Sequence, residues 1–195
     1  MLEISWLVIT YLLASFPFGL LIAQAFCGID PRTAGSRNTG STNVARLCGF
    51  GYGVATLLLD VLKGFLPVAL GTAFSHSAFF LSLVALTAII GHMHSVFLNG
   101  QGGKGVATTI GAFLAISPFG TLFALIICVV LIATSGFVSM GSLGFAASLP
   151  LFMLLTGNFG FILVALLVAV IIFVKHGENI ARLKKGEEKP WLKKS

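Results

Sequence analysis

Apolar residues dominate this chain in long runs, which short polar or glycine-rich stretches interrupt. The runs cover residues 4–26, 50–71, 78–98, 106–116, 118–134, 137–156 and 159–175. Because a helix needs roughly 20 apolar residues to cross a bilayer, the pattern predicts seven membrane-spanning segments. The fourth run is too short for a straight crossing at about 1.5 Å per residue, so we expect it to be a partial or shielded span.

Composition supports a membrane protein. The 195 residues are 57% hydrophobic and 9% charged, with a mean hydropathy of +1.03, whereas soluble domains are about 25% charged. We therefore expect an all-α integral membrane protein that forms a single polytopic domain over residues 1–195. No Lys or Arg precedes the first apolar run, as a secretory signal would require, so this run should be retained as a span.

Basic residues predict the orientation. The first connection carries Arg32, Arg37 and Arg46, the third carries Lys104, and seven more basic residues follow from Lys175 onward. Cytoplasmic segments are enriched in Lys and Arg, so these three regions should be cytoplasmic and the N-terminus should lie outside. A cytoplasmic C-terminus then requires an odd number of spans, which seven satisfies and six does not.

Charge and cysteine content argue against a nucleic-acid-binding protein and against a cysteine metal site. The net charge of +6 does not indicate nucleic-acid binding, because seven of the twelve Lys and Arg residues lie from Lys175 onward, in a segment that ends in the basic tail 183–195 and carries no motif that reads DNA or RNA. We therefore expect no nucleic-acid partner. The three cysteines, Cys27, Cys48 and Cys128, show neither metal-ligand spacing nor an obvious pairing. We expect them to be reduced packing residues.

Three polar stretches, at 35–46, 99–108 and 175–182, carry cationic side chains among glycine, serine and asparagine. Backbone N–H groups, helix N-termini and cations can converge on an oxyanion there, which favours phosphate binding. The first stretch supplies short polar or flexible residues and one guanidinium: Ser36, Asn38, Gly40, Ser41, Thr42, Asn43 and Arg46. Asn43 is also expected to cap a helix that begins near Val44. An ordinary polar loop with a cap is the alternative.

The second stretch contains Gly102, Gly103, Lys104 and Gly105 just before an apolar run. A helix starting there would direct its N–H groups and its dipole to the same side as the Lys104 ammonium. The Walker pattern needs a Ser or Thr after the lysine, and glycine stands there instead, so we do not infer ATP binding. The alternative is a flexible turn whose lysine only determines topology.

The third stretch places His176 and Asn179 three residues apart, so that one helix face can present both, with Glu178 between them. Histidine is suited to proton transfer near neutral pH. His92 and His94 flank the second stretch and offer the same chemistry. Histidines without a function are common at membrane surfaces, and this alternative stays open for all three.

Asp60 and Lys63 lie inside the second apolar run, where an unsatisfied charge would cost about 2.5–3.5 kcal/mol. Their spacing allows them to pair, either as a purely structural ion pair or as a support for the polar loops. The remaining carboxylates on the inner side are scattered, so no set of acidic residues is available to hold Mg²⁺. No histidine is followed by an aspartate after four residues, the arrangement of the common glycerolipid acyltransferases.

Four motifs in this order resemble the signature of the bacterial membrane acyl-phosphate:glycerol-3-phosphate acyltransferases. They comprise Gly35-Ser36, Asn38, Gly40, Thr42-Asn43 and Arg46; Asp60-x-x-Lys63-Gly64; Gly91-His92 with Gly102 to Thr108; and His176-x-Glu178-Asn179-Ile180. Three departures stand out: Arg37 replaces the usual glycine, Ser41 replaces alanine, and His94-Ser95 replaces an aromatic–proline pair.

The resemblance implies seven spans in a bacterial inner membrane, with an active site facing the cytoplasm. It implies transfer of an acyl group from acyl phosphate to the 1-hydroxyl of glycerol 3-phosphate, without metal or other cofactor, as the first step of phospholipid synthesis. The enzyme that produces acyl phosphate is then a candidate partner, and membrane lipids surround the protein.

Under this reading the site residues take separate roles. Phosphates would be held by the first loop and by Gly102 to Gly105, with Lys104 and Arg46 supplying charge and Ser142 assisting. His176 and Asn179 would orient or deprotonate the hydroxyl. Asp60, Lys63, His92 and Glu178 would support these groups. The alternatives are a transporter or exchanger of phosphate-bearing metabolites, whose site should lie near the bilayer midplane, and a non-catalytic lipid-binding scaffold.

Overall fold

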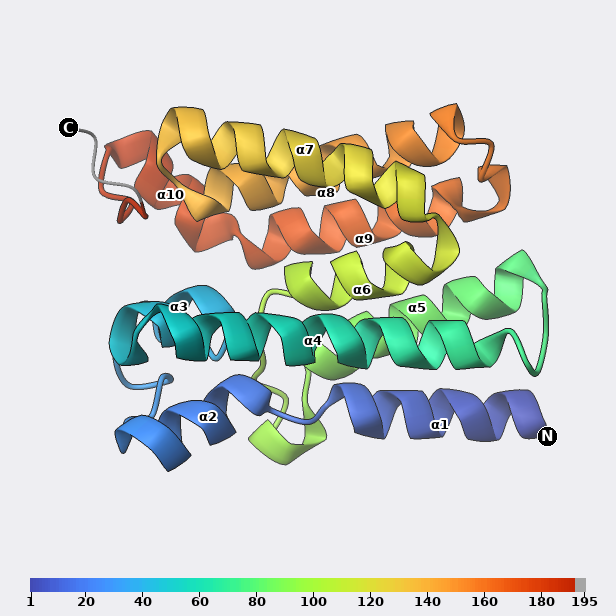
Figure 1. The fold of residues 1–195 in the computed structure, drawn as a ribbon, viewed down its shortest axis with the longest axis horizontal. Coiled ribbons are helices and arrows are strands. Elements are labelled where there is room, and N and C mark those ends of the chain that lie inside the picture. Colours follow the sequence, from blue (N-terminus) through green and yellow to red (C-terminus); the bar gives the residue numbers. More distant parts are fainter. Residues whose placement is uncertain (192–195) are drawn as a thin grey trace. The chain divides into compact units, whose positions relative to one another are not determined.

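The computed structural model describes residues 1–191, and every regular element in that part of the chain is helical (Figure 1). The chain forms two compact units, Met1–Ile116 and Ser117–Ser195. The first contains α1 (Leu2–Ala14), α2 (Phe18–Cys27), α3 (Ser41–Cys48), α4 (Phe50–Gly71), α5 (Ala78–Met93), the 3-10 turn η1 (Val96–Leu98) and α6 (Val106–Ile116). The second contains α7 (Pro118–Ser135), α8 (Val138–Leu155), η2 (Phe159–Phe161), α9 (Ile162–Lys175) and α10 (Gly177–Lys185). The end of the basic tail, residues 192–195, lies outside the described residues.

The expected all-α membrane architecture is confirmed. Five helical segments are long and apolar enough to cross a bilayer: Leu2–Cys27, Phe50–Gly71, Ala78–Leu98, Pro118–Ser135 and Val138–Leu155. A sixth candidate, Phe159–Lys175 with Gly177–Lys185, is bent by 57°. The remaining segment, the fourth of the predicted runs, is the 11-residue helix α6, which is as short as expected.

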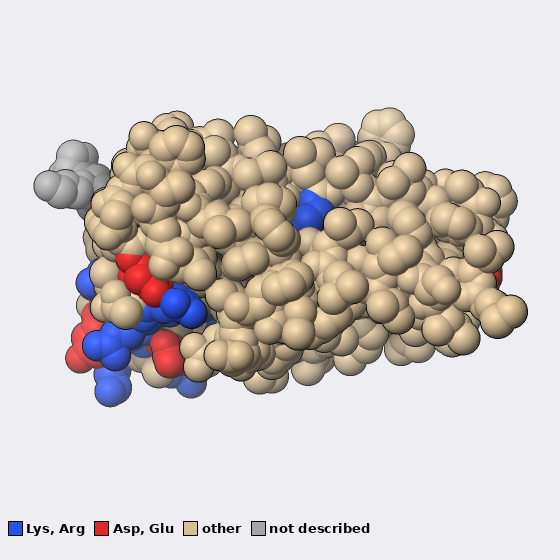
Figure 2. Space-filling view, turned by 90° about the horizontal axis from the view of Figure 1, so that it is seen from below, with Lys and Arg blue, Asp and Glu red and all other residues tan. Residues whose placement is uncertain are grey.

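Charged side chains are rare on the face seen in Figure 2 except at one end. They gather at the left of that view, the end at which α2 and α3 lie in Figure 1, and the rest of the face is almost entirely uncharged. Large apolar side chains such as Leu2, Leu58 and Phe79 are more than half exposed. A lipid environment accounts for this surface, because monomeric soluble proteins rarely expose large contiguous apolar patches.

The first predicted span, expected as one continuous run, is broken at Ser15, Phe16 and Pro17. Proline lacks a backbone N–H and disfavours a helical conformation at the preceding residue, which explains the interruption. The carbonyl of Phe16, which the break removes from the helix ladder, accepts a hydrogen bond of 2.9 Å from the Lys63 ammonium. The break therefore leaves a backbone carbonyl that can accept a hydrogen bond from a charged side chain inside the membrane.

Helix α6 packs along α4 through two glycines. A Cβ added to Gly64 would lie 2.1 Å from the Thr108 carbonyl oxygen, and one added to Gly111 would lie 1.9 Å from that of Val61. Neither position tolerates a larger side chain, and small residues of this kind allow membrane helices to approach closely. This contact shields the short helix within the first unit.

Cys27 and Cys48 form a disulfide, so the expectation that all three cysteines are reduced is wrong for this pair. The two residues end α2 and α3, and their Cα atoms are 5.9 Å apart. The two helices bring together residues 21 positions apart, which spacing alone could not reveal. Cys128 is unbonded and buried in α7, as expected.

Candidate functional site

Asn43 organises the first polar loop. Its Oδ1 accepts a hydrogen bond of 2.8 Å from the backbone N–H of Ser36, and its Nδ2 donates to the carbonyl oxygens of Pro31, Ala34 and Asn38 at 2.9–3.1 Å. The side chain is buried, at 1% exposure. The amide thus makes four contacts with the loop's own backbone, which fixes the path of the chain.

The predicted capping role of Asn43 is wrong. Helix α3 begins at Ser41 after Gly40, so Asn43 lies in the first turn and its side chain reaches back into the loop. The close fit requires glycine at position 35, because a Cβ there would lie 2.2 Å from Asn43 Oδ1 and the backbone φ is +64°. Asn38 closes a smaller turn by accepting the N–H of Gly40 at 2.8 Å.

The other candidate phosphate-binding residues of the first loop lie in or next to the backbone that the Asn43 side chain holds in place. Ser36, Asn38 and Thr42 are half-buried, and Arg46 lies exposed in the last turn of α3. Arg37, which stands where the resembling family has glycine, adopts φ +54°. A left-handed conformation costs a residue with a Cβ roughly 1–2 kcal/mol, which explains why glycine suits this position.

His92 lies directly beneath the glycine loop that carries Lys104. Its carbonyl oxygen accepts a hydrogen bond of 3.2 Å from the N–H of Gly103. A Cβ on Gly102 would lie 2.0 Å from that same oxygen, and one on Gly103 would lie 2.1 Å from the ring atom Nε2. The loop therefore rests on both the backbone and the imidazole of His92, and α6 begins directly after it at Val106, as predicted.

Gly102→Ala should raise the KM for a phosphate-bearing substrate at least about tenfold, because the loop must move away from a backbone carbonyl that cannot yield. Steady-state kinetics in detergent would measure the change. Gly51→Ala is the matched control, since nothing lies within 4 Å of the added Cβ there. Equal KM values for the two variants would refute the role of this close contact.

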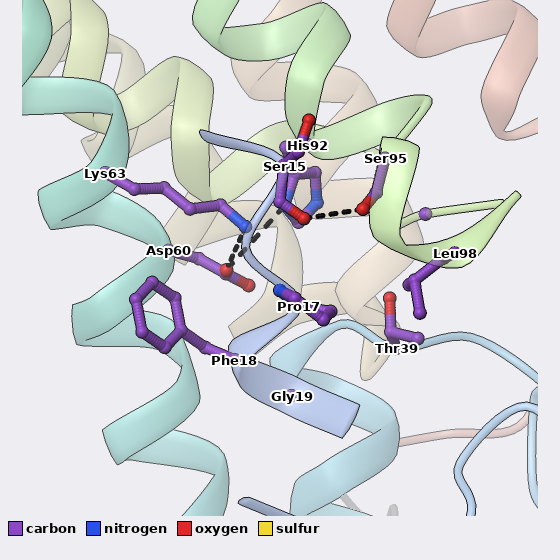
Figure 3. Close-up of a pocket in the computed structure, with 11 residues that line it drawn as sticks. Ser15, Pro17, Phe18, Gly19, Thr39, Asp60, Lys63, His92, Ser95 and Leu98 are labelled. Carbon is purple, nitrogen blue, oxygen red and sulfur yellow. Dashed lines mark hydrogen bonds and ion pairs between the residues drawn. The ribbon is translucent and has the colours of Figure 1, made fainter. Parts of the chain in front are cut away.

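Asp60 and Lys63 pair as predicted, with Nζ and Oδ1 2.8 Å apart and both side chains almost fully buried. Nδ1 of His92 lies 3.6 Å from the same carboxylate oxygen. Figure 3 shows these three side chains pointing toward one another in a small pocket, which the broken first span and Thr39 also line. The network therefore connects α4 to His92, whose backbone and ring contact the glycine loop.

His94 and Ser95, which replace the aromatic–proline pair of the resembling family, both take part in hydrogen bonds to the first span. The Ser95 hydroxyl donates a hydrogen bond of 2.6 Å to the carbonyl oxygen of Ser15, at the break in the first span. Tyr11 donates a hydrogen bond of 2.7 Å to the carbonyl oxygen of His94. Proline at position 95 could make no such side-chain contact, so this chain fastens the end of α5 to the broken helix by its own polar group.

In the second unit, His176 lies at the bend between α9 and α10 and is 3% exposed. Its Nδ1 lies 2.8 Å from the carbonyl oxygen of Ile172. Because a carbonyl can only accept, Nδ1 carries the proton, and Nε2 is the basic nitrogen of the neutral ring.

Glu188 is a central residue of this unit that was not predicted from the sequence. Its carboxylate accepts hydrogen bonds from Ser139 Oγ at 2.9 Å, Asn179 Nδ2 at 2.6 Å and Arg182 Nε at 2.7 Å. The chain turns back after α10 at Gly186, whose φ is +71°. This glycine was the available signal, since a left-handed glycine commonly ends a helix and reverses the chain.

The Glu188 contacts predict a pH effect on stability. Burial raises the pKa of this carboxyl, but the hydrogen bonds from Asn179, Arg182 and Ser139 outweigh it and hold the pKa below its ordinary 4.5. A depressed pKa in the folded protein stabilises the fold above about pH 4.5, and this contribution is lost as pH falls through the folded-state value. Melting curves should show a steeper loss of stability below pH 4.5 in the natural protein than in Glu188→Gln; parallel curves would contradict this.

The remaining candidates of the second unit are placed as follows. Ser139 and Ser142 are both buried at 6% exposure, and they lie within α8, which begins at Val138. Glu178 is exposed and makes a loose ion pair of 3.6 Å with Arg182. Within residues 1–191, no three His, Cys, Asp or Glu side chains are grouped closely enough to hold a metal ion.

Known proteins resemble this chain over almost its whole length. The sequence model of the glycerol-3-phosphate acyltransferase family matches residues 4–186. Glycerol-3-phosphate acyltransferases from Maridesulfovibrio salexigens and Desulfovibrio desulfuricans are 55% and 52% identical, over 100% and 99% of this chain and 100% and 86% of their own.

A crystal structure of PlsY, an integral membrane glycerol 3-phosphate acyltransferase in its glycerol 3-phosphate form, is also similar. It is 35% identical and superposes with a TM-score of 0.93 over 97% of this chain and 96% of its own. The lysophosphatidic acid form of PlsY gives a TM-score of 0.90 at 34% identity, over 97% of this chain and 95% of its own. The chain belongs to the glycerol-3-phosphate acyltransferase family.

Proposed function

We infer that this protein transfers an acyl group from acyl phosphate to the 1-hydroxyl of sn-glycerol 3-phosphate, which gives 1-acylglycerol 3-phosphate and inorganic phosphate. The observation that carries this inference is the near-complete match to an acyltransferase solved in both its glycerol 3-phosphate and its lysophosphatidic acid forms. The glycine-lined loops of the first unit suit two phosphate-bearing substrates.

The reaction needs positioning more than activation, because acyl phosphate is already a mixed anhydride. The glycerol 1-oxygen attacks the carbonyl carbon, the bond from that carbon to the phosphate oxygen breaks, and phosphate departs. The hydroxyl proton passes to a base or to the departing phosphate. Holding the two reactants in line and stabilising the developing oxyanion are the contributions required of the protein.

All the phosphate-binding roles except that of Ser142 belong to the first unit. Lys104 and the N–H groups of Gly102 to Gly105 bind one phosphate ahead of α6, where the helix dipole also favours an anion. The loop that Asn43 organises binds the other through Ser36, Asn38, Gly40 and Thr42, and Arg46 clamps it with its planar fork. The support of both loops by buried hydrogen bonds favours this assignment.

In the second unit, His176 accepts the hydroxyl proton through Nε2, and Asn179 orients the hydroxyl. The hydrogen bond from Asn179 Nδ2 to Glu188 sets the direction of the amide, so that its oxygen points away from that carboxylate. Ser142 assists in phosphate binding and Glu178 supports the bend. These roles require no cofactor.

The protein crosses the bacterial cytoplasmic membrane seven times, with its N-terminus outside and its loops of basic residues in the cytoplasm. The distribution of Lys and Arg supports this topology. Acyl phosphate is hydrolytically reactive and carries an apolar tail, so direct delivery by the enzyme that produces it is expected.

Product analysis tests the function. The purified protein is given palmitoyl phosphate, palmitoyl-CoA or palmitoyl acyl carrier protein with glycerol 3-phosphate, and lipids are identified by mass spectrometry. Only palmitoyl phosphate should yield palmitoyl-glycerol 3-phosphate. Equal yield from the thioesters would refute the donor assignment, and uptake of glycerol 3-phosphate into protein-containing liposomes without any acylated product would support transport instead.

A further inference from the structure

The disulfide between Cys27 and Cys48 encloses the whole first polar loop. Cys27 is the last residue of α2 and Cys48 the last residue of α3, so the ring that the bond closes contains the proposed phosphate-binding residues from Ser36 to Arg46. Both cysteines are half-buried, so small solutes can reach the bond. Neither cysteine has a part in the acyl transfer described above.

The disulfide fastens the C-terminal end of α3 covalently to the end of α2. At the start of the helix, Asn43 ties the chain to the loop. In its middle, Ala45 packs on Gly53, where an added Cβ would lie 2.3 Å from the Ala45 Cβ. Helix α3 has only 8 residues, and isolated helices of this length are unstable, so its last turn depends on such fastenings.

Arg46 lies in that last turn, two residues before Cys48. An unfastened helix end frays, and the guanidinium would then have to be ordered when the phosphate binds. When the disulfide holds the end of α3, Arg46 is already partly ordered, so less conformational entropy is lost when the phosphate binds. The state of the disulfide therefore changes how well Arg46 is placed before the substrate arrives.

We propose that Cys27 and Cys48 are a reversible oxidative modification site, whose disulfide form binds glycerol 3-phosphate more tightly than its dithiol form. The proposal rests on the function proposed above and on the cytoplasmic position of the first loop. Thiols in that compartment are kept reduced, and the disulfides that do form there are usually transient and redox-sensing. A stacked pair, Phe26 and Tyr52, with centroids 5.4 Å apart, holds α2 against α4 and keeps the two cysteines close after reduction.

The redox step balances with a dithiol as reductant, either a small molecule or a thioredoxin-like protein. Its thiolate attacks one sulfur of the pair and forms a mixed disulfide, while the other cysteine leaves as a thiolate and takes a proton. The second thiol of the reductant then displaces the remaining cysteine. Two electrons reduce the Cys27–Cys48 bond to two thiols, and the reductant becomes a disulfide.

Kinetics of the full-length protein in two verified redox states test the proposal. Samples are treated with oxidised glutathione or dithiothreitol, and alkylation with a maleimide-polyethylene glycol shows the number of thiols on a gel. We expect the KM for glycerol 3-phosphate to be about 3- to 10-fold lower in the oxidised state. Reduction should raise it reversibly, with little change in kcat.

Cysteine variants distinguish an effect of the Cys27–Cys48 disulfide from other effects of the redox treatment. Cys48→Ser should show the KM of the reduced protein and no response to dithiothreitol, whereas Cys128→Ser, which alters the unbonded cysteine, should respond like the natural protein. Trypsin cleavage after Arg37 provides a readout independent of catalysis and should be slower in the oxidised state.

Two results would overturn the proposal: no disulfide forms on oxidation, or KM and cleavage rate are the same in the two states. Absence of acylated product in both states would count against the proposed function instead, and the cleavage rates would then decide whether the redox state controls the loop.

Discussion

Lys104→Ala should lower kcat/KM by about 10²- to 10³-fold while the protein stays folded. The ammonium stands in a glycine loop that ends at the start of α6, so under the proposed function it adds a full charge to the backbone N–H groups that bind the substrate phosphate. Removing one such preorganised group typically has an effect of this size. The rate of phosphate release, together with a melting curve, would measure both parts of the expectation.

Two variants serve as controls for Lys104. Lys104→Arg keeps the charge but changes its shape, so it should retain more activity than the alanine variant. Lys184→Ala removes a lysine from the exposed part of α10 and should leave kcat/KM near its natural value. Activity of Lys104→Ala within about threefold of the natural protein would exclude an electrostatic role in transfer.

Asp60→Ala should destabilise the protein by about 3–5 kcal/mol, the largest stability effect expected for a single substitution here. Asp60 is 2% exposed and pairs with the buried Lys63 ammonium at 2.8 Å. Without the carboxylate, an uncompensated charge would remain inside the membrane-spanning part of α4. Thermal unfolding in detergent, or the yield of monodisperse protein, would report the loss.

A double variant separates the charge effect from loss of packing. Asp60→Leu combined with Lys63→Met removes both charges, so it should be more stable than Asp60→Ala alone. Asp30→Ala breaks the exposed pair with Arg32 and should have little effect on stability. If the double variant were no more stable than the single one, the buried charge would not be the cause.

Hydrophobic runs and charge spacing predicted the features that depend on local sequence. The seven apolar segments correspond to the five long candidate spans, the bent pair and the short helix α6. The Asp60–Lys63 pair followed from its spacing on one helix face. Membrane helices are predictable in this way because the bilayer requires each to satisfy its own backbone.

Features that depend on contacts between distant residues were not predictable from the sequence. Asn43 was expected to cap a helix, but its side chain reaches back to Pro31, 12 residues earlier. The partners of Glu188 lie 6 to 49 residues away in the chain. The proline that breaks the first span was visible, but its signal is weak inside a run that is otherwise uniformly apolar.

Phosphate release by the purified protein in detergent is the most direct test of acyl transfer from acyl phosphate to glycerol 3-phosphate. Palmitoyl phosphate is supplied with and without glycerol 3-phosphate, in EDTA and without nucleotide. We expect release only when both substrates are present, with one molecule of 1-acylglycerol 3-phosphate formed per phosphate. Release that does not depend on glycerol 3-phosphate, or no release from a folded sample, would contradict the proposed reaction.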